Sequence, residues 1–222
     1  MRRRRAQLHA GWLEAQLGHY TSFEDLWEEL ESVRDDRSMA AVLTTGDRFA
    51  ETSEVVTPEQ ARRFERFELA TVFAFDGPLE GPGLEIALSS DIRLCGPDAT
   101  IRIPLGNRRS LALIGPEASA GLMATRGTVD AAAALACGFV SGVASSGAEA
   151  VTEARALAAT IASRGPIAVR LGKEAIWRGL EMPISQALRF ETDLTLLLQT
   201  TKDRAEGVRA FTEKRQPHFT GE

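Results

Sequence analysis

Two short apolar runs separated by a well-marked helix start constrain the fold of this 222-residue chain more than any other feature. Residues 39–44 and 70–75 have the length and composition of buried strands. Between them, Thr57 and Pro58 predict a helix that begins with Thr57 as N-cap and Pro58 at the first helical position. Strand and helix patterns alternate again through residues 84–103. This order predicts an α/β architecture.

The two ends of the chain are predicted to be helical. Residues 11–33 carry apolar side chains at near-helical spacing, and the four arginines Arg2 to Arg5 before them are interpreted as a solvated end. The predicted helix at 183–200 is apolar over much of its surface, which indicates burial on several sides or a subunit interface. Helices are expected after residue 115 at about 116–126, 129–137, 148–163, 166–180, 183–200 and 202–214.

Composition and charge argue against several classes of function. The formal net charge is -5, so nothing favours nucleic acid as a partner. No apolar run is long enough to span a bilayer, and no membrane partner is expected. Cys95 and Cys137 are far apart and are interpreted as small buried residues, which suits a reducing, cytoplasmic location. No histidine or cysteine has metal-ligand spacing, so no metal site is predicted.

One segment has the composition of a catalytic site. In Gly81-Pro82-Gly83-Leu84-Glu85, flexible backbone leads into a predicted helix, whose first N–H groups would be unpaired and suited to a developing oxyanion. Glu85 would lie within one turn of them, close enough to transfer a proton. From the residues alone, the interpretation of Glu85 as an acidic first-turn residue that complements the helix dipole is favoured over a catalytic role.

Four stretches in order resemble the crotonase (enoyl-CoA hydratase/isomerase) superfamily. Residues 75–93, Phe-Asp-Gly-Pro-Leu-Glu-Gly-Pro-Gly-Leu-Glu-Ile-Ala-Leu-Ser-Ser-Asp-Ile-Arg, resemble that family's glycine-rich signature and the Asp-Ile-Arg after it. Residues 42–49 are similar to its Leu-Thr-Gly-x-x-x-Phe turn. Residues 129–140 and 203–215 are similar to two of its later helices.

The resemblance implies a spiral of ββα units followed by helices that pack trimers, often as dimers of trimers. We therefore expect a crotonase-like core over residues 1–145, lacking the family's N-terminal strands, and a C-terminal helical trimerisation region over residues 146–222. The expected partners are an acyl-CoA or acyl-carrier-protein thioester and further copies of the chain, as a homotrimer or hexamer. Coenzyme A would enter as part of the substrate, with no separate cofactor.

Residue by residue, the resemblance implies a catalytic site that has changed. Glu85 matches one catalytic glutamate, and Ser53 matches the first oxyanion donor. The second donor falls on Pro82, which has no N–H, so Gly81 or Gly83 would have to replace it. Leu105 stands where the family has its second catalytic glutamate. Two-carboxylate addition of water is therefore not expected.

The resemblance also implies contacts with CoA from Glu51, Phe211 and Lys214, the last two often from a neighbouring subunit. Lys214 is equally readable as a basic last-turn residue that complements the helix dipole. Glu80, at a position that is usually apolar, is interpreted as a solvated residue rather than a relocated acid.

Two functions remain open. In the first, Glu85 transfers a proton next to a thioester carbonyl, in isomerisation, epimerisation, decarboxylation or slow hydration. In the second, the chain is a non-catalytic crotonase paralogue that binds a thioester or completes an assembly. Glu85 and the C-terminal pattern favour the first, whereas Pro82 and Leu105 favour the second.

Overall fold

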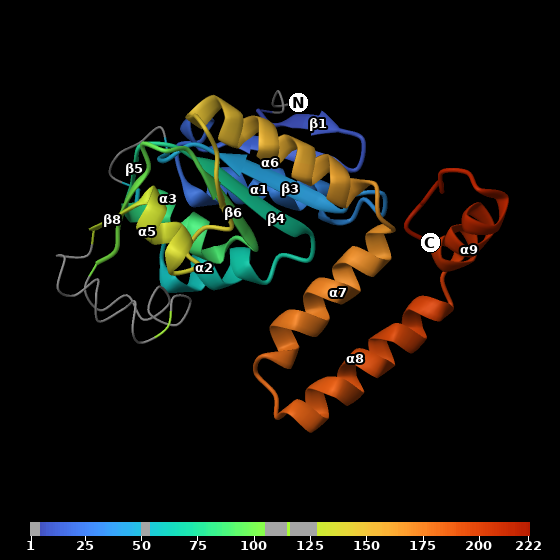
Figure 1. Cartoon of the computed structure of the whole chain (residues 1–222). Helices are drawn as coiled ribbons and strands as arrows, with labels where there is room; N and C mark the ends of the chain where they lie inside the picture. The colour runs from blue at the N-terminus through green and yellow to red at the C-terminus, as the bar shows by residue number, and fades with distance from the viewer. Residues whose placement is uncertain (1–4, 50–53, 105–114, 116–127) are drawn as a thin grey trace.

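Residues 5–49, 54–104, 115 and 128–222 are described by the computed structural model (Figure 1). The strands are β1 (Gln7–His9), β2 (Trp12–Gln16), β3 (Ala41–Thr45), β4 (Ala70–Phe75), β5 (Pro78–Leu79), β6 (Ile92–Cys95), β7 (Thr100–Arg102), β8 (Thr128–Asp130) and β9 (Gly142–Val143). Six form a sheet in the order β1-β2-β3-β4-β6-β9, parallel except for β1 against β2. Strands β5, β7 and β8 form a smaller sheet. The predicted α/β architecture is confirmed.

Local sequence accounts for where most helices begin. Thr57 caps its helix and exchanges hydrogen bonds with Gln60 in a capping box, as its position before Pro58 predicted. Ser22, Ser146 and Thr201 accept N–H groups at three other helix starts. The described helices are the 3-10 helix η1 (Leu17–His19) and α1 (Phe23–Arg34), α2 (Pro58–Glu65), α3 (Gly81–Ser89), α5 (Ala131–Ala136), α6 (Gly147–Ala162), α7 (Pro166–Gly179), α8 (Ile184–Gln199) and α9 (Lys202–Glu213). The helix predicted over 116–126 lies outside the described residues.

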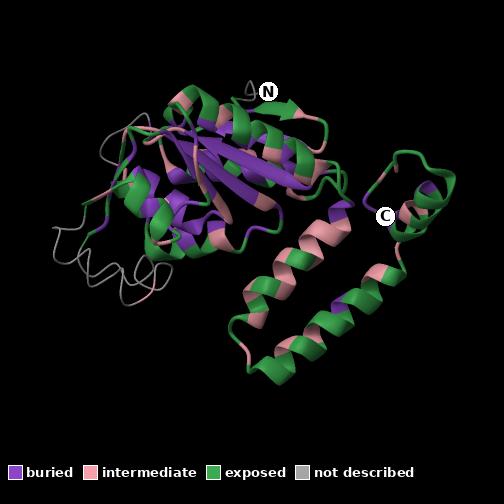
Figure 2. Cartoon of the chain, viewed as in Figure 1, coloured by how far each residue is buried: buried purple, intermediate pink, exposed green. Residues whose placement is uncertain are grey.

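The inner strands of the main sheet, β2, β3, β4 and β6, are largely buried, as Figure 2 shows. Along β4, Val72 and Ala74 point to the face covered by α6, while Phe73 and Phe75 point to the larger core beneath α1, α2 and α3. Because successive strand residues face opposite sides, an uninterrupted apolar strand needs a cover on each side. The helix α6 supplies one cover with alanines at four-residue spacing, which let it approach the sheet closely.

The N-terminal segment corrects two expectations. Residues 12–16 form strand β2, not a helix, and with β1 they supply N-terminal strands that the sequence was expected to lack. Gly11, at φ +80°, makes the turn between the two strands. Trp12 and Leu13 are buried on opposite faces of the sheet, and Glu14 forms an ion pair with Arg155 of α6 at 2.7 Å. A strand that is buried on both faces does not alternate between apolar and polar residues. The spacing of its apolar residues was therefore compatible with a helix.

The helices after α6 extend away from the sheet. The predicted division at residue 145 groups α6 with them, but α6 covers the sheet, and the extending part starts at Pro166. On α7, on α8 and in the turn between them, large apolar side chains lie more than half exposed (Figure 2). They are Ile176, Leu180, Ile184, Leu188, Leu196 and Leu197.

Candidate active site

The first turn of α3 is built by its glycines and proline. Glu80 is the extended N-cap, with φ -151° and ψ 171°. Gly81 follows at φ +55°, a left-handed conformation that glycine adopts without steric cost. Pro82 lies in the first turn, where a missing N–H costs no helical hydrogen bond. This local geometry starts the helix abruptly at the end of β5.

Hydrogen bonding at this helix start begins at Leu84. Leu84 N donates to Glu80 O at 3.5 Å, which begins the helical bonding. Across the part of the chain that the structure describes, the N–H groups of Gly81 and Gly83 have no acceptor. Pro82 between them has none to donate. The first turn therefore offers donors on either side of the position predicted for the second oxyanion contact.

Gly83 brings this turn against the β3–α2 connection. A Cβ at Gly83 would lie 1.9 Å from the carbonyl oxygen of Asp47, so only glycine fits. Phe49, just beyond, is 1% exposed. On the other side of residues 50–53, Glu54 accepts a hydrogen bond from Phe23 N at the start of α1, at 2.8 Å. The chain is therefore held in place on both sides of residues 50–53, which include Ser53, the predicted first oxyanion donor.

Glu85 lies on α3 one turn after Gly81 and is partly exposed. Its carbonyl oxygen accepts the Ser89 hydroxyl at 2.7 Å. A carboxylate at this place can exchange a proton with a group held at the helix start. Gly81, Gly83 and Glu85 thus all lie in the first two turns of one helix.

The other end of α3 is held by a buried arginine. Arg93, 7% exposed, donates to the carbonyl oxygens of Ala87 and Ser90 in the last turn, and to Phe139 O. Burial lowers the pKa of Arg93, but a guanidinium stays protonated in proteins. A cation at the C-terminal carbonyls complements the helix dipole. Arg93 therefore holds the C-terminal end of the helix that carries Glu85. The only signal of this role in the sequence was the Asp-Ile-Arg motif at residues 91–93, which resembles the family's.

Asp91 joins α3 to the C-terminal helices. Its carboxylate accepts Thr71 N at 2.8 Å and Trp177 Nε1 at 2.9 Å, and lies 2.7 Å from Lys173 Nζ. Lys173 also donates to Leu69 O at 2.9 Å. Burial lowers the pKa of Lys173, and the Asp91 carboxylate acts in the opposite direction. Because Lys173 and Trp177 both lie on α7, Asp91 links the site helix to the region outside the sheet.

Glu80 lies at the surface beside the helix start. Leu79 pairs with Ile101 between β5 and β7, and both side chains are buried. One residue further on, Glu80 and Arg102 are 61% and 71% exposed, with 3.7 Å between Oε2 and Nη1. An exposed pair at this distance contributes little stability. The interpretation of Glu80 as a solvated residue is consistent with this position.

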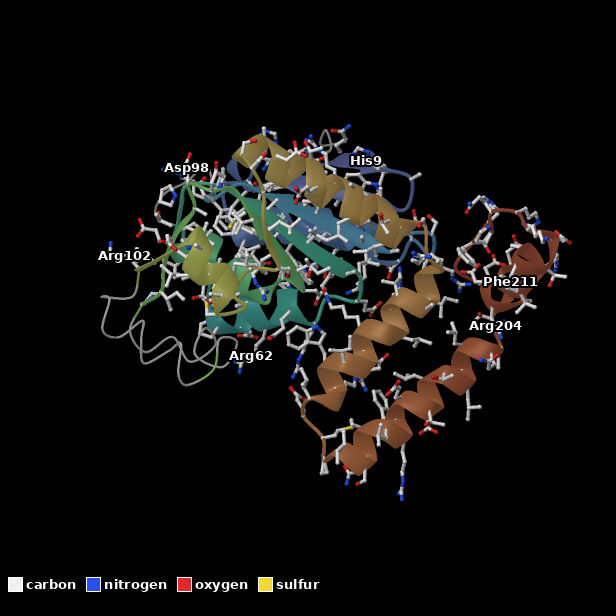
Figure 3. All side chains as sticks on the ribbon, viewed as in Figure 1. His9, Arg62, Asp98, Arg102, Arg204 and Phe211 are labelled. Carbon is white, nitrogen blue, oxygen red and sulfur yellow. The ribbon has the colours of Figure 1, made fainter. Side chains whose placement is uncertain are left out.

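Other predicted site residues are not brought to α3. Phe211 is 87% exposed on α9, and Lys214 ends that helix in the left-handed conformation at φ +54°. Figure 3 shows Phe211 at the opposite end of the molecule from Arg102, which lies beside the start of α3. Within one chain, Phe211 and Lys214 are therefore remote from Glu85. The predictions for Glu51, Ser53 and Leu105 fall outside the described residues.

The start of α3 offers backbone N–H groups and one carboxylate within the same helix. Helix-start N–H groups polarise a carbonyl, and a nearby carboxylate moves a proton on the adjoining carbon. Within the described ranges, no three His, Cys, Asp or Glu side chains gather where a metal ion could bind. None of the described helices is long and apolar enough to cross a membrane.

Comparison with known proteins identifies relatives of this chain. The family model described as enoyl-CoA hydratase/isomerase matches residues 48–222. A protein named probable enoyl-CoA hydratase 2, mitochondrial, from Arabidopsis thaliana is 34% identical over 184 residues, which cover 76% of this chain and 61% of that protein. The short-chain-enoyl-CoA hydratase of Clostridium acetobutylicum is 33% identical over 165 residues, 70% of this chain and 63% of the relative.

The fold matches solved structures over nearly its whole length. The crystal structure of enoyl-CoA hydratase from Bacillus anthracis superposes with a TM-score of 0.82 at 26% identity, covering 98% of each chain. In sequence, this chain spans less than two thirds of the curated relatives described above. The matched family model, the order of the motifs and the shared fold lead to one conclusion: this chain belongs to the enoyl-CoA hydratase/isomerase family of the crotonase superfamily.

Proposed function

We propose that the chain binds an acyl thioester at the start of α3 and that Glu85 transfers a proton next to the thioester carbonyl. The observation that carries this proposal is the first turn of α3, where the Gly81 and Gly83 N–H groups lack acceptors in the described structure and Glu85 follows one turn later. The relatives' names, which are those of enoyl-CoA hydratases, support a CoA thioester as the ligand.

The proposed chemistry needs one carboxylate. Glu85 takes a proton from the carbon next to the carbonyl, and the negative charge moves onto the carbonyl oxygen. The N–H groups of Gly81 and Gly83 stabilise that charge through hydrogen bonds. The proton then returns from Glu85 to the substrate, which accounts for isomerisation or epimerisation without a separate cofactor. Coenzyme A takes part only as the non-reacting portion of the substrate by which the protein binds it.

We further propose that the working form is a homotrimer or hexamer. Six large apolar side chains of α7, α8 and the turn between them are more than half exposed in the single chain, and such a patch is typical of a protein interface. The distance of Phe211 and Lys214 from α3 supports the same idea, since a neighbouring copy would bring them to the thioester's nucleotide.

The second candidate is a non-catalytic paralogue that binds the thioester without turnover. Pro82 favours it, because removing one oxyanion donor typically costs about two to three orders of magnitude in rate. The same fold, the same helix start and the same oligomer serve either function. Only a measurement of proton transfer separates them.

The test is deuterium uptake. A panel of acyl- and enoyl-CoA thioesters is incubated with the protein in heavy water and analysed by mass spectrometry, beside Glu85→Gln and a control, Glu80→Gln. Glu80 is a matched control because it is a surface glutamate one turn before Glu85. Uptake that disappears in Glu85→Gln but persists in Glu80→Gln supports the proposal. If a folded, oligomeric sample takes up no deuterium from solvent into any thioester, the proposed catalysis is refuted. The non-catalytic paralogue is then the remaining candidate.

A further inference from the structure

The last residues of the chain fold back along α9. The C-terminal segment (residues 215–222) leaves the helix at Lys214 and returns toward the junction of α6 and α7 (Figure 1). Arg215 forms two hydrogen bonds with the Glu206 carboxylate, at 2.6 and 2.9 Å. His218 N donates to the same carboxylate at 2.9 Å. Glu206 thus holds the start of the segment against the helix.

Asp203, in the first turn of α9, holds the end of the segment. Its carboxylate is buried and accepts Thr220 N at 2.7 Å and Gly221 N at 2.9 Å. Asp203 N donates in turn to Glu222 O at 3.0 Å. A buried carboxylate is stable only when its oxygens are satisfied, and hydrogen bonds to an ionised group are the stronger kind. Asp203 therefore closes the segment around α9.

The closed segment is the part that touches the core. A Cβ at Gly221 would lie 1.9 Å from the carbonyl oxygen of Arg37, in the turn after α1, so Gly221 packs directly on that backbone. Gly221 is also at φ +73°, which favours glycine. The Phe219 ring lies between Gly165, before α7, and Gly207 of α9, with 3.7 Å to a Cβ built at either glycine. The segment is thus wedged between α9 and the core.

We propose that Asp203 is a positioning residue for nucleotide binding: by closing the C-terminal segment it fixes where α9 presents Phe211 and Lys214. Both residues are exposed and lie at least two helical turns after Asp203, so the effect acts through the helix. Lys214 is held in the left-handed conformation, with Lys214 N bonded to Phe211 O at 3.2 Å and Arg215 N bonded to Ala210 O at 3.0 Å. The inference rests on the proposed function, in which a CoA thioester is the ligand.

The experiment measures affinity for acetyl-CoA by calorimetry in the wild-type chain and in three variants. Asp203→Asn keeps the shape of the side chain but loses its charge and one acceptor. Gly221→Ala breaks the same closure from the other side, through the contact with Arg37. Asp193→Asn, an exposed aspartate of α8, is the control. Amide hydrogen exchange of α9 is followed in each protein, as is Glu85-dependent deuterium uptake at saturating thioester.

We expect the dissociation constant to rise about tenfold in Asp203→Asn, the size expected for losing a hydrogen bond to a charged group. It should rise in the same direction in Gly221→Ala, whose Cβ would push the segment away from Arg37. Exchange within α9 rises in the same two variants, while deuterium uptake at saturation and the Asp193→Asn control stay unchanged. Combining Asp203→Asn with Phe211→Ala weakens binding by less than the sum of the two single effects, because Asp203 acts partly through Phe211.

Three results overturn the proposal. Faster exchange in α9 with unchanged affinity shows that the segment holds the helix without serving the nucleotide. Unchanged exchange shows that it does not hold the helix. If the wild type does not bind acetyl-CoA, both the proposed thioester ligand and this inference are wrong. Binding without Glu85-dependent uptake refutes only the proposed catalysis, and the dissociation constants still decide the role of Asp203.

Discussion

Restoring the lost backbone donor at residue 82 is the sharpest perturbation of this site. In Pro82→Ala the helix start gains an N–H between those of Gly81 and Gly83, at the position that the family resemblance gives to the second oxyanion donor. One such donor changes the rate by about 10²- to 10³-fold. We therefore expect Glu85-dependent turnover of the responding thioester to rise by about that factor, mainly in kcat.

The cost to folding is small and separable from the gain in rate. Replacing a proline that fits its backbone conformation loses about 0.4–1 kcal/mol, because the unfolded chain regains conformational freedom. For a chain of this length, about 1 kcal/mol corresponds to a shift of about 2–4 °C in the thermal midpoint. Pro58→Ala is the matched control, since Pro58 is an exposed first-turn proline on α2. It should lower the midpoint similarly and leave the rate unchanged.

The assay is the initial rate of deuterium uptake or water addition across a range of thioester concentrations, for Pro82→Ala alone and together with Glu85→Gln. A rise that the Glu85→Gln change abolishes places the restored N–H and the carboxylate on one reaction. Equal rates in Pro82→Ala and wild type would show that the N–H of residue 82 does not face the carbonyl oxygen. The assignment of the second oxyanion donor to residue 82 would then be wrong, and the N–H groups of Gly81 and Gly83 would remain the proposed donors.

Three further changes test the packing around the site and at α9. Gly83→Ala should destabilise the protein by about 1–3 kcal/mol in denaturant titrations, because its Cβ would lie 1.9 Å from the Asp47 carbonyl oxygen. Gly172→Ala, in an exposed helix position with nothing within 4 Å of the new Cβ, should instead be slightly stabilising; a loss of stability in both would refute the close-contact argument. Lys214→Gly should raise stability by about 1 kcal/mol, since glycine adopts φ +54° without strain, while weakening acetyl-CoA binding; an unchanged thermal midpoint would contradict it. Hydrogen bonds from the Arg215 side chain and the His218 N–H hold the pKa of Glu206 at about 2, against an ordinary 4.5, so its contribution is present above pH 4.5 and lost as pH falls toward 2. Between pH 4.5 and 2, the thermal midpoint of the wild type should accordingly fall more steeply than that of Glu206→Gln. Parallel curves of midpoint against pH would refute the pairing of Glu206 with Arg215 and His218.

Local chemistry in the sequence determined much of this fold. Thr57 and Pro58 specify the start of α2 from their own conformational preferences and hydrogen bonds. Gly81 and Pro82 specify the start of α3 in the same way. The residue order from 75 to 93 was enough to predict that Glu85 lies within a turn of unpaired N–H groups. In each case the residues that cause the structure are neighbours along the chain.

Tertiary structure alone decided the rest. Residues 12–16 became a strand because β3 and α6 cover them, and their spacing by itself imitated a helix. No local pattern reveals that Gly83 packs on the Asp47 carbonyl, or that Asp203 accepts N–H groups from residues 220 and 221. Capping and turn preferences act over a few residues, whereas burial and close contacts depend on segments that only the folded chain brings together.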